Sequence, residues 1–86
     1  MILTVYETRP EERPTLVQVG TVTIGAYGVL SVETEDEGLQ VLIASLEVTT
    51  DMRGTPIPPM DPHYPEAVAD SIGRQSQWVY TAELAA

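Results

Sequence analysis

Three short segments rich in valine, isoleucine and threonine occupy the N-terminal part of the chain, at residues 2–6, 16–24 and 29–33. Branched side chains of this kind favour extended backbone, because they pack well on a pleated surface. The connection between the first two segments contains prolines, and the connection between the second and third contains glycines. Both residue types favour turns. The pattern therefore predicts an antiparallel meander of three strands.

The second of these segments changes its alternation at Gly20. Val17 and Val19 precede the glycine, whereas Val22 and Ile24 follow it with the opposite parity. A glycine at such a shift predicts a bulge or a bend in the strand.

Residues 34–46 predict a helix. Thr34 and Glu37 have the spacing of a capping box, in which each side chain bonds the backbone of the other. A strand over residues 39–44, apolar on both faces, is the alternative, and the helix is favoured because cap and periodicity agree. With Gly38 in the first helical turns, Gly38→Ala is expected to stabilise the fold by about 0.4–1 kcal/mol. The stripe expected to face the core is Leu39, Leu42, Ile43 and Leu46.

Residues 48–60 contain three prolines and a glycine, a density of helix and strand breakers that predicts a loop. Loops of this length are often functional in small domains. Met52 and Ile57 are expected to attach the loop to the core. Arg53, beside Gly54, could bind a carboxylate or phosphate, although a solvated turn residue is the simpler interpretation.

A second helix is expected to begin at Asp61, with Pro62 in its first turn, and to end at Gly73. Its buried stripe would contain Tyr64, Val68 and Ile72.

Residues 77–84 alternate as a strand with one face on a core. The complete pattern predicts one α+β domain in the order β-β-β-α-loop-α-β, with the last strand returning to the sheet and both helices on one face. The side chains expected to share the inner face of the last strand are Trp78, Tyr80, Ala82 and Leu84.

The chain has few groups suited to catalysis. It contains no cysteine and no lysine, which excludes a thiolate nucleophile and a Schiff base, and its one histidine is His63. A general base could be built from Asp61, His63 and Glu66, but no nucleophile motif accompanies them. The acidic residues 33–37 lack the spacing of a calcium loop. We therefore expect no catalytic, metal or cofactor site.

The net charge of −9 limits the classes of partner. It disfavours direct binding to nucleic acid or to anionic membranes, since four arginines cannot neutralise a row of phosphates. A basic protein partner is electrostatically allowed. With no apolar run long enough to span a bilayer and no N-terminal signal pattern, a cytoplasmic location is expected.

These observations favour a non-enzymatic interaction domain, either a homodimer or a subunit of a larger assembly, because a chain this small gains by burying more apolar surface. The alternative is an acidic inhibitor or immunity-type protein that masks a basic partner such as a nuclease. The candidate partner-binding residues are Trp78, Tyr80, Val79, Arg53 and Tyr64.

Overall fold

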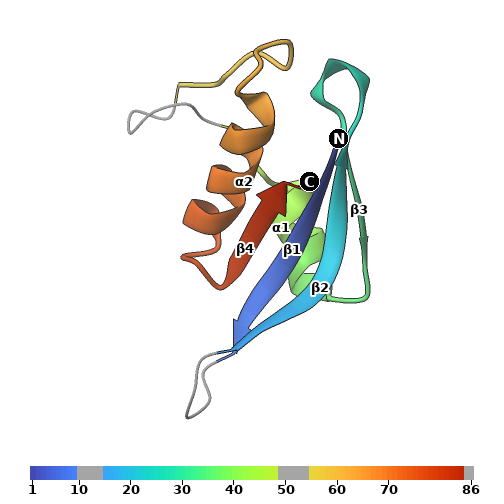
Figure 1. Ribbon diagram of the computed structural model, residues 1–86, viewed down its shortest axis with the longest axis vertical. Helices are drawn as coiled ribbons and strands as arrows, with labels where there is room; N and C mark the ends of the chain where they lie inside the picture. The colour runs from blue at the N-terminus through green and yellow to red at the C-terminus, as the bar shows by residue number, and fades with distance from the viewer. Residues whose placement is uncertain (10–14, 49–54, 85–86) are drawn as a thin grey trace.

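A computed structural model describes residues 1–9, 15–48 and 55–84 of the chain. Four strands form one antiparallel sheet in the order β3-β2-β1-β4, so β3 and β4 are its two edges (Figure 1). The predicted α+β class and element order are confirmed. The elements are β1 (Ile2–Arg9), β2 (Thr15–Ile24), the short 3-10 turn η1 (Ala26–Gly28), β3 (Leu30–Thr34), α1 (Glu37–Ala44), α2 (Tyr64–Gln75) and β4 (Tyr80–Leu84).

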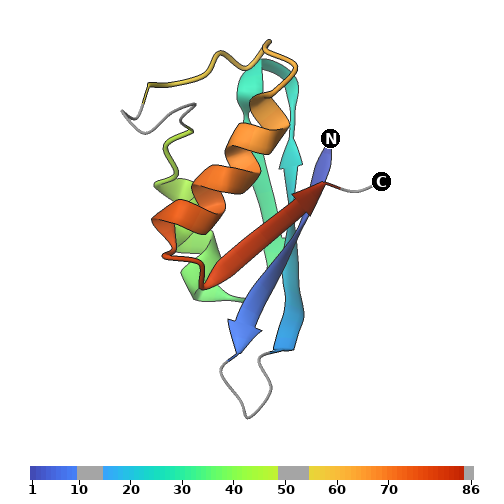
Figure 2. The same ribbon diagram turned by 60° about the vertical axis from the view of Figure 1, so that its left-hand side comes forward.

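Both helices cover the same face of the sheet, as the two views show (Figures 1 and 2). The opposite face carries mainly hydroxyl-bearing side chains, as is usual for an antiparallel sheet with one face in solvent. The buried apolar side chains that form the core are Leu3, Val5, Val22, Leu39, Ile43, Ile57, Tyr64, Val68, Ile72 and Tyr80.

The bulge predicted at Gly20 is present where β1 pairs with β2. Val5 lies opposite Gly20 and Tyr6 lies opposite Gln18, so Val19 is the additional residue of β2. The shift keeps apolar residues toward the helices on both sides of the bulge, which explains the change of parity in the sequence.

The helix predicted in the middle of the chain is α1, but Asp36 caps it in place of Thr34. The Asp36 carboxylate accepts a hydrogen bond from the Leu39 amide at 3.2 Å. The Thr34 hydroxyl is engaged elsewhere, because it donates to the Val19 carbonyl at 2.6 Å. Leu39 is fully buried, whereas Leu46 lies beyond the end of the helix and is only partly buried, so the predicted core stripe is shorter than expected.

The second predicted helix is α2, and its buried stripe of Tyr64, Val68 and Ile72 is confirmed. It begins later than expected, at Tyr64, because the Asp61 carboxylate accepts the His63 amide in the preceding turn at 2.8 Å. In the loop before α2, Ile57 is buried as predicted, while Met52 lies outside the described residues.

The prediction that α2 ends at Gly73 is wrong, because the helix continues to Gln75. Its end is closed by a Schellman pair: the Trp78 amide donates to the Gly73 carbonyl at 2.7 Å and the Gln77 amide to Arg74 at 3.1 Å. The position that glycine usually fills is occupied by Gln77, with φ at 54°, and Trp78 follows at 63°. The glycine of this region is needed inside the helix, where Trp78 packs against it.

Gly38→Ala is now expected to destabilise the protein, opposite to the expectation from helix propensity. Gly38 is helical as predicted, but a Cβ there would lie 2.6 Å from the Tyr80 hydroxyl oxygen, which belongs to a buried side chain. Overpacking of this kind costs about 1–3 kcal/mol. In urea unfolding, Gly38→Ala should lower the free energy of unfolding when Tyr80 is present. In a Tyr80→Phe background the same substitution should be neutral or stabilising. A loss that persists in that background would contradict the assigned cause.

Gln77→Gly is expected to raise the free energy of unfolding by about 1 kcal/mol, because glycine adopts the left-handed conformation without a Cβ clash. Gln77→Ala is the control, since it removes the polar side chain but keeps the Cβ. Equal effects of the two substitutions in urea unfolding would show that the backbone at this turn is not strained.

Candidate functional site

Trp78 and Val79 are two exposed apolar residues in the turn between α2 and β4. The indole lies on Gly73, where a Cβ would come within 2.2 Å of the ring. Its other side is open, so that Trp78 is 54% exposed and Val79 is 47% exposed. Large apolar side chains that are packed on one side and open on the other are typical anchors of protein interfaces.

The expectation that Trp78 and Tyr80 share one face of a strand is wrong. The strand begins at Tyr80, and the left-handed conformation of Trp78 breaks the alternation before it. Periodicity alone could not reveal this, because residues 77–84 have an unbroken alternating pattern in the sequence.

The remaining candidate residues do not lie in this turn. Tyr80 and Tyr64 are buried, and the Tyr64 hydroxyl donates to the Gly28 carbonyl at 3.3 Å. Both tyrosines therefore stabilise the fold. Arg53 lies outside the described residues.

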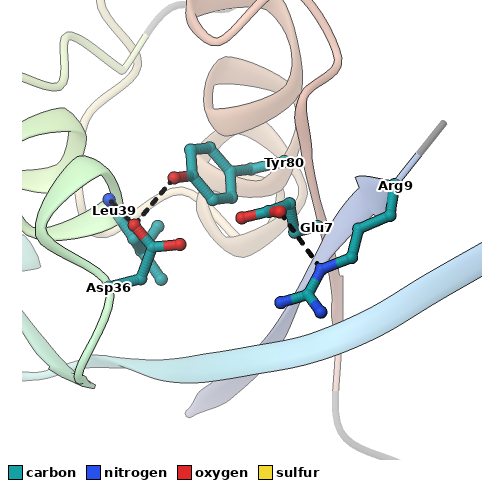
Figure 3. A network of polar contacts seen from close by, with 5 residues as sticks. All are labelled: Glu7, Arg9, Asp36, Leu39 and Tyr80. Atoms are coloured by element: carbon teal, nitrogen blue, oxygen red, sulfur yellow. Dashed lines mark hydrogen bonds and ion pairs between the residues drawn. The ribbon is translucent and has the colours of Figure 1, made fainter.

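Tyr80 belongs to a polar network that joins β4 to α1 and β1 (Figure 3). Its hydroxyl donates to Asp36 Oδ1 at 3.0 Å, the same oxygen that caps α1. Glu7, directly opposite Tyr80 on β1, forms an ion pair with Arg9 at 3.3 Å. The Asp36 carboxylate thus joins the start of α1 to β4, while the Glu7–Arg9 pair lies within β1.

The electrostatics of this network keep the Tyr80 proton in place. Burial, followed by the hydrogen bond to Asp36 and the charges of Asp36 and Glu7, raises the pKa of Tyr80 to about 12. Burial alone would raise the pKa of Asp36, but the hydrogen bonds it accepts, first from Tyr80 and then from Leu39, hold that pKa below its usual range. A tyrosine that retains its proton so firmly is unsuited to general base chemistry.

The Asp61–His63 pair is the other arrangement that could serve acid–base chemistry. Asp61 Oδ1 lies 3.1 Å from His63 Nδ1, and the imidazole side chain is 77% exposed. The pKa of Asp61 is lowered first by the His63 backbone amide and further by its side chain. Within the described ranges, no group of three histidine or carboxylate side chains is arranged to hold a metal ion. The pair fixes the turn before α2, and the expectation that it forms no catalytic site stays a prediction.

Sequence reasoning missed the role of Ser76, which lies at the end of α2. Its hydroxyl oxygen accepts the Tyr80 amide at 3.1 Å, and its proton is in reach of the Gly73 and Tyr80 carbonyls. Ser76 thereby provides hydrogen-bond partners for the amide and carbonyl of Tyr80, the first residue of an edge strand. The sequence gives no direct signal for this contact, because it depends on which strand becomes the edge.

Charge on the described surface is mainly negative. The chain has thirteen carboxylates and four arginines. Of the arginines that the structure describes, Arg9 pairs with Glu7, and Arg74 pairs with Asp70 at 2.7 Å. These cations are therefore already engaged with carboxylates of the same chain.

Comparison with known proteins identifies no matching family model, and no curated protein or solved structure matches at a significant level. Among the residues described, none of the helices has the length and apolar character needed to cross a membrane. The site must therefore be judged on its own geometry.

Stability is expected to fall as the pH rises from about 10 to about 12. Tyr80 has a raised pKa in the folded protein, so its contribution is complete below the pKa of an unfolded tyrosine and is lost as the folded group ionises. The rise of the Tyr80 pKa corresponds to about 3 kcal/mol of stability. Urea unfolding across this pH range should show that the free energy of unfolding of the wild type falls. The decrease should be smaller in Tyr80→Phe. Identical pH profiles would contradict the assignment.

Proposed function

We propose that this protein is a non-enzymatic interaction domain of the cytoplasm, which acts as a homodimer or as a subunit of a larger assembly. The observation that carries the proposal is the exposure of Trp78 and Val79, two large apolar residues that are each about half exposed directly before β4. Tryptophan contributes strongly to interface energy when a partner completes its burial.

Backbone strain in this turn supports the same proposal. Gln77 and Trp78 both have left-handed φ values, which for residues with a Cβ cost about 1–2 kcal/mol each. Strain of this kind often accompanies functional surfaces, because the surrounding structure must maintain it. The strained turn directs the indole onto Gly73 and leaves its opposite side accessible.

A second candidate function is that of an acidic inhibitor or immunity-type protein that masks a basic partner, such as a nuclease. The net charge of −9 supports it, together with the engagement of Arg9 and Arg74 in ion pairs within the chain. Electrostatic attraction would accelerate association with such a partner, and the rate would fall with added salt.

Val79→Lys is expected to dissociate a homodimer without unfolding the monomer, because it places a charge at an exposed apolar position next to Trp78 in the chain. Light scattering gives the mass, and circular dichroism checks the fold. Val41→Lys is the matched control: Val41 lies on α1, is 68% exposed, and acquires the same charge. If Val79→Lys keeps a dimeric mass, Val79 does not lie in the dimer interface. A wild type that is monomeric at high micromolar concentration would exclude the homodimer and favour a different partner.

A further inference from the structure

The outer edge of β4 presents main-chain hydrogen-bonding groups of known direction. The Thr8 amide donates to the Val79 carbonyl at 2.9 Å, which fixes the phase of the β1–β4 ladder. In an antiparallel ladder the direction alternates, so Thr81 and Glu83 turn their amides and carbonyls toward β1. Tyr80, Ala82 and Leu84 therefore turn theirs away from the sheet. Figure 2 shows β4 in front, with no other element crossing it.

Ser76 closes one end of this edge. It accepts the outward amide of Tyr80 at 3.1 Å and lies 3.3 Å from the Tyr80 carbonyl. Among the residues described, the outward groups of Ala82 and Leu84 have no such partner. The open section of the edge therefore consists of these two residues, with Glu83 between them.

A second copy of the chain fits this section poorly. Two β4 strands related by a two-fold axis at Ala82 would pair Tyr80 with Leu84, which requires the Ser76–Tyr80 contact to break. An axis at Glu83 leaves that contact intact but places the two Glu83 side chains directly opposite each other. Like charges in that position destabilise a sheet. These two registers of self-pairing are therefore penalised.

A strand with a basic residue opposite Glu83 meets neither obstacle. Glu83 is exposed on the open face of the sheet, beside Thr4 of β1, and has no ion-pair partner within the described part of the chain. Leu84 lies opposite Leu3, on the helix-covered side, and is 41% exposed. The edge thus offers a carboxylate on one face and an apolar side chain on the other.

We propose that β4 binds an extended basic segment of another protein as an antiparallel fifth strand. A lysine or arginine of that segment lies opposite Glu83, and its two neighbours exchange main-chain hydrogen bonds with Ala82 and Leu84. This mode of binding obtains affinity from the main chain and specificity from alternate side chains. The inference rests on the proposed interaction function and selects its partner.

The probe is an acetylated and amidated pentapeptide, threonine-valine-lysine-valine-threonine, titrated into the full chain and followed by NMR. The backbone amide signals of Ala82 and Leu84 should shift, and their exchange with solvent should slow. A peptide with glutamate in place of lysine should bind about tenfold more weakly, because the cross-strand pair becomes repulsive. A lysine peptide with N-methylated valines should also lose binding, because it cannot donate to the edge.

Variants of the chain test the same register. Ala82→Pro removes an outward amide and should abolish binding while circular dichroism stays native-like, since proline is tolerated where an edge amide faces solvent. Glu83→Lys should reverse the preference between the lysine and glutamate peptides. Glu33→Lys is the matched control, because Glu33 has the same charge and is exposed on the other edge strand, opposite Thr21. It should leave the preference unchanged.

Three outcomes would overturn the proposal. The first is a lysine peptide that leaves Ala82 and Leu84 unperturbed at millimolar concentration. The second is binding that Ala82→Pro and Glu83→Lys do not alter, which would place the site elsewhere while leaving the interaction function intact. The third is a shift of these two signals with protein concentration alone, which would identify a second copy as the occupant. Failure of the proposed homodimer is read separately, from the masses of the wild type and of Val79→Lys in light scattering.

Discussion

The hydrogen bond between the Tyr80 hydroxyl and Asp36 Oδ1 is the contact on which the arrangement of the elements most depends. The same oxygen caps α1 through the Leu39 amide, so one carboxylate joins the start of a helix to an edge strand far away in the sequence. Without it, β4 would be held by the β1 ladder and by packing against α2. The bond also explains why Gly38 must remain glycine, since the hydroxyl occupies the space that a Cβ would need.

The class and order of the fold could be predicted because their signals are local. Branched side chains marked the strands, and the 3.6-residue periodicity marked both helices. The errors arose where a distant contact decided between two local options. Thr34 and Asp36 are both suitable caps, and the selection of Asp36 follows from the Val19 carbonyl engaging Thr34 and from Tyr80 engaging Asp36. Neither partner can be identified from the segment itself.

The turn after α2 shows the same limit. Gly73 looked like a helix terminator, but its function is to let the Trp78 ring lie against the helix. Gln77 then adopts the left-handed conformation at the end of the helix, although glycine is the residue usually found in that position. For the candidate site, the sequence named Trp78 and Val79 as partner-binding candidates but placed Trp78 on the inner face of the last strand. Their exposure depends on the turn, and the edge position of β4 depends on strand pairing across the whole sheet.

Acidic side chains lie on both edge strands of the sheet. Each edge strand is closed at its helix-proximal end by a side chain: Ser76 bonds Tyr80 on β4, and Gln40 Nε2 donates to the Thr34 carbonyl on β3 at 3.0 Å. Each also carries an exposed glutamate on the open face, Glu83 or Glu33. Charged side chains and capped main-chain groups are the means by which sheets avoid uncontrolled pairing. The same carboxylates that repel a like charge attract a cation, and this asymmetry is the basis of the proposal that β4 accepts a basic strand more readily than a copy of itself.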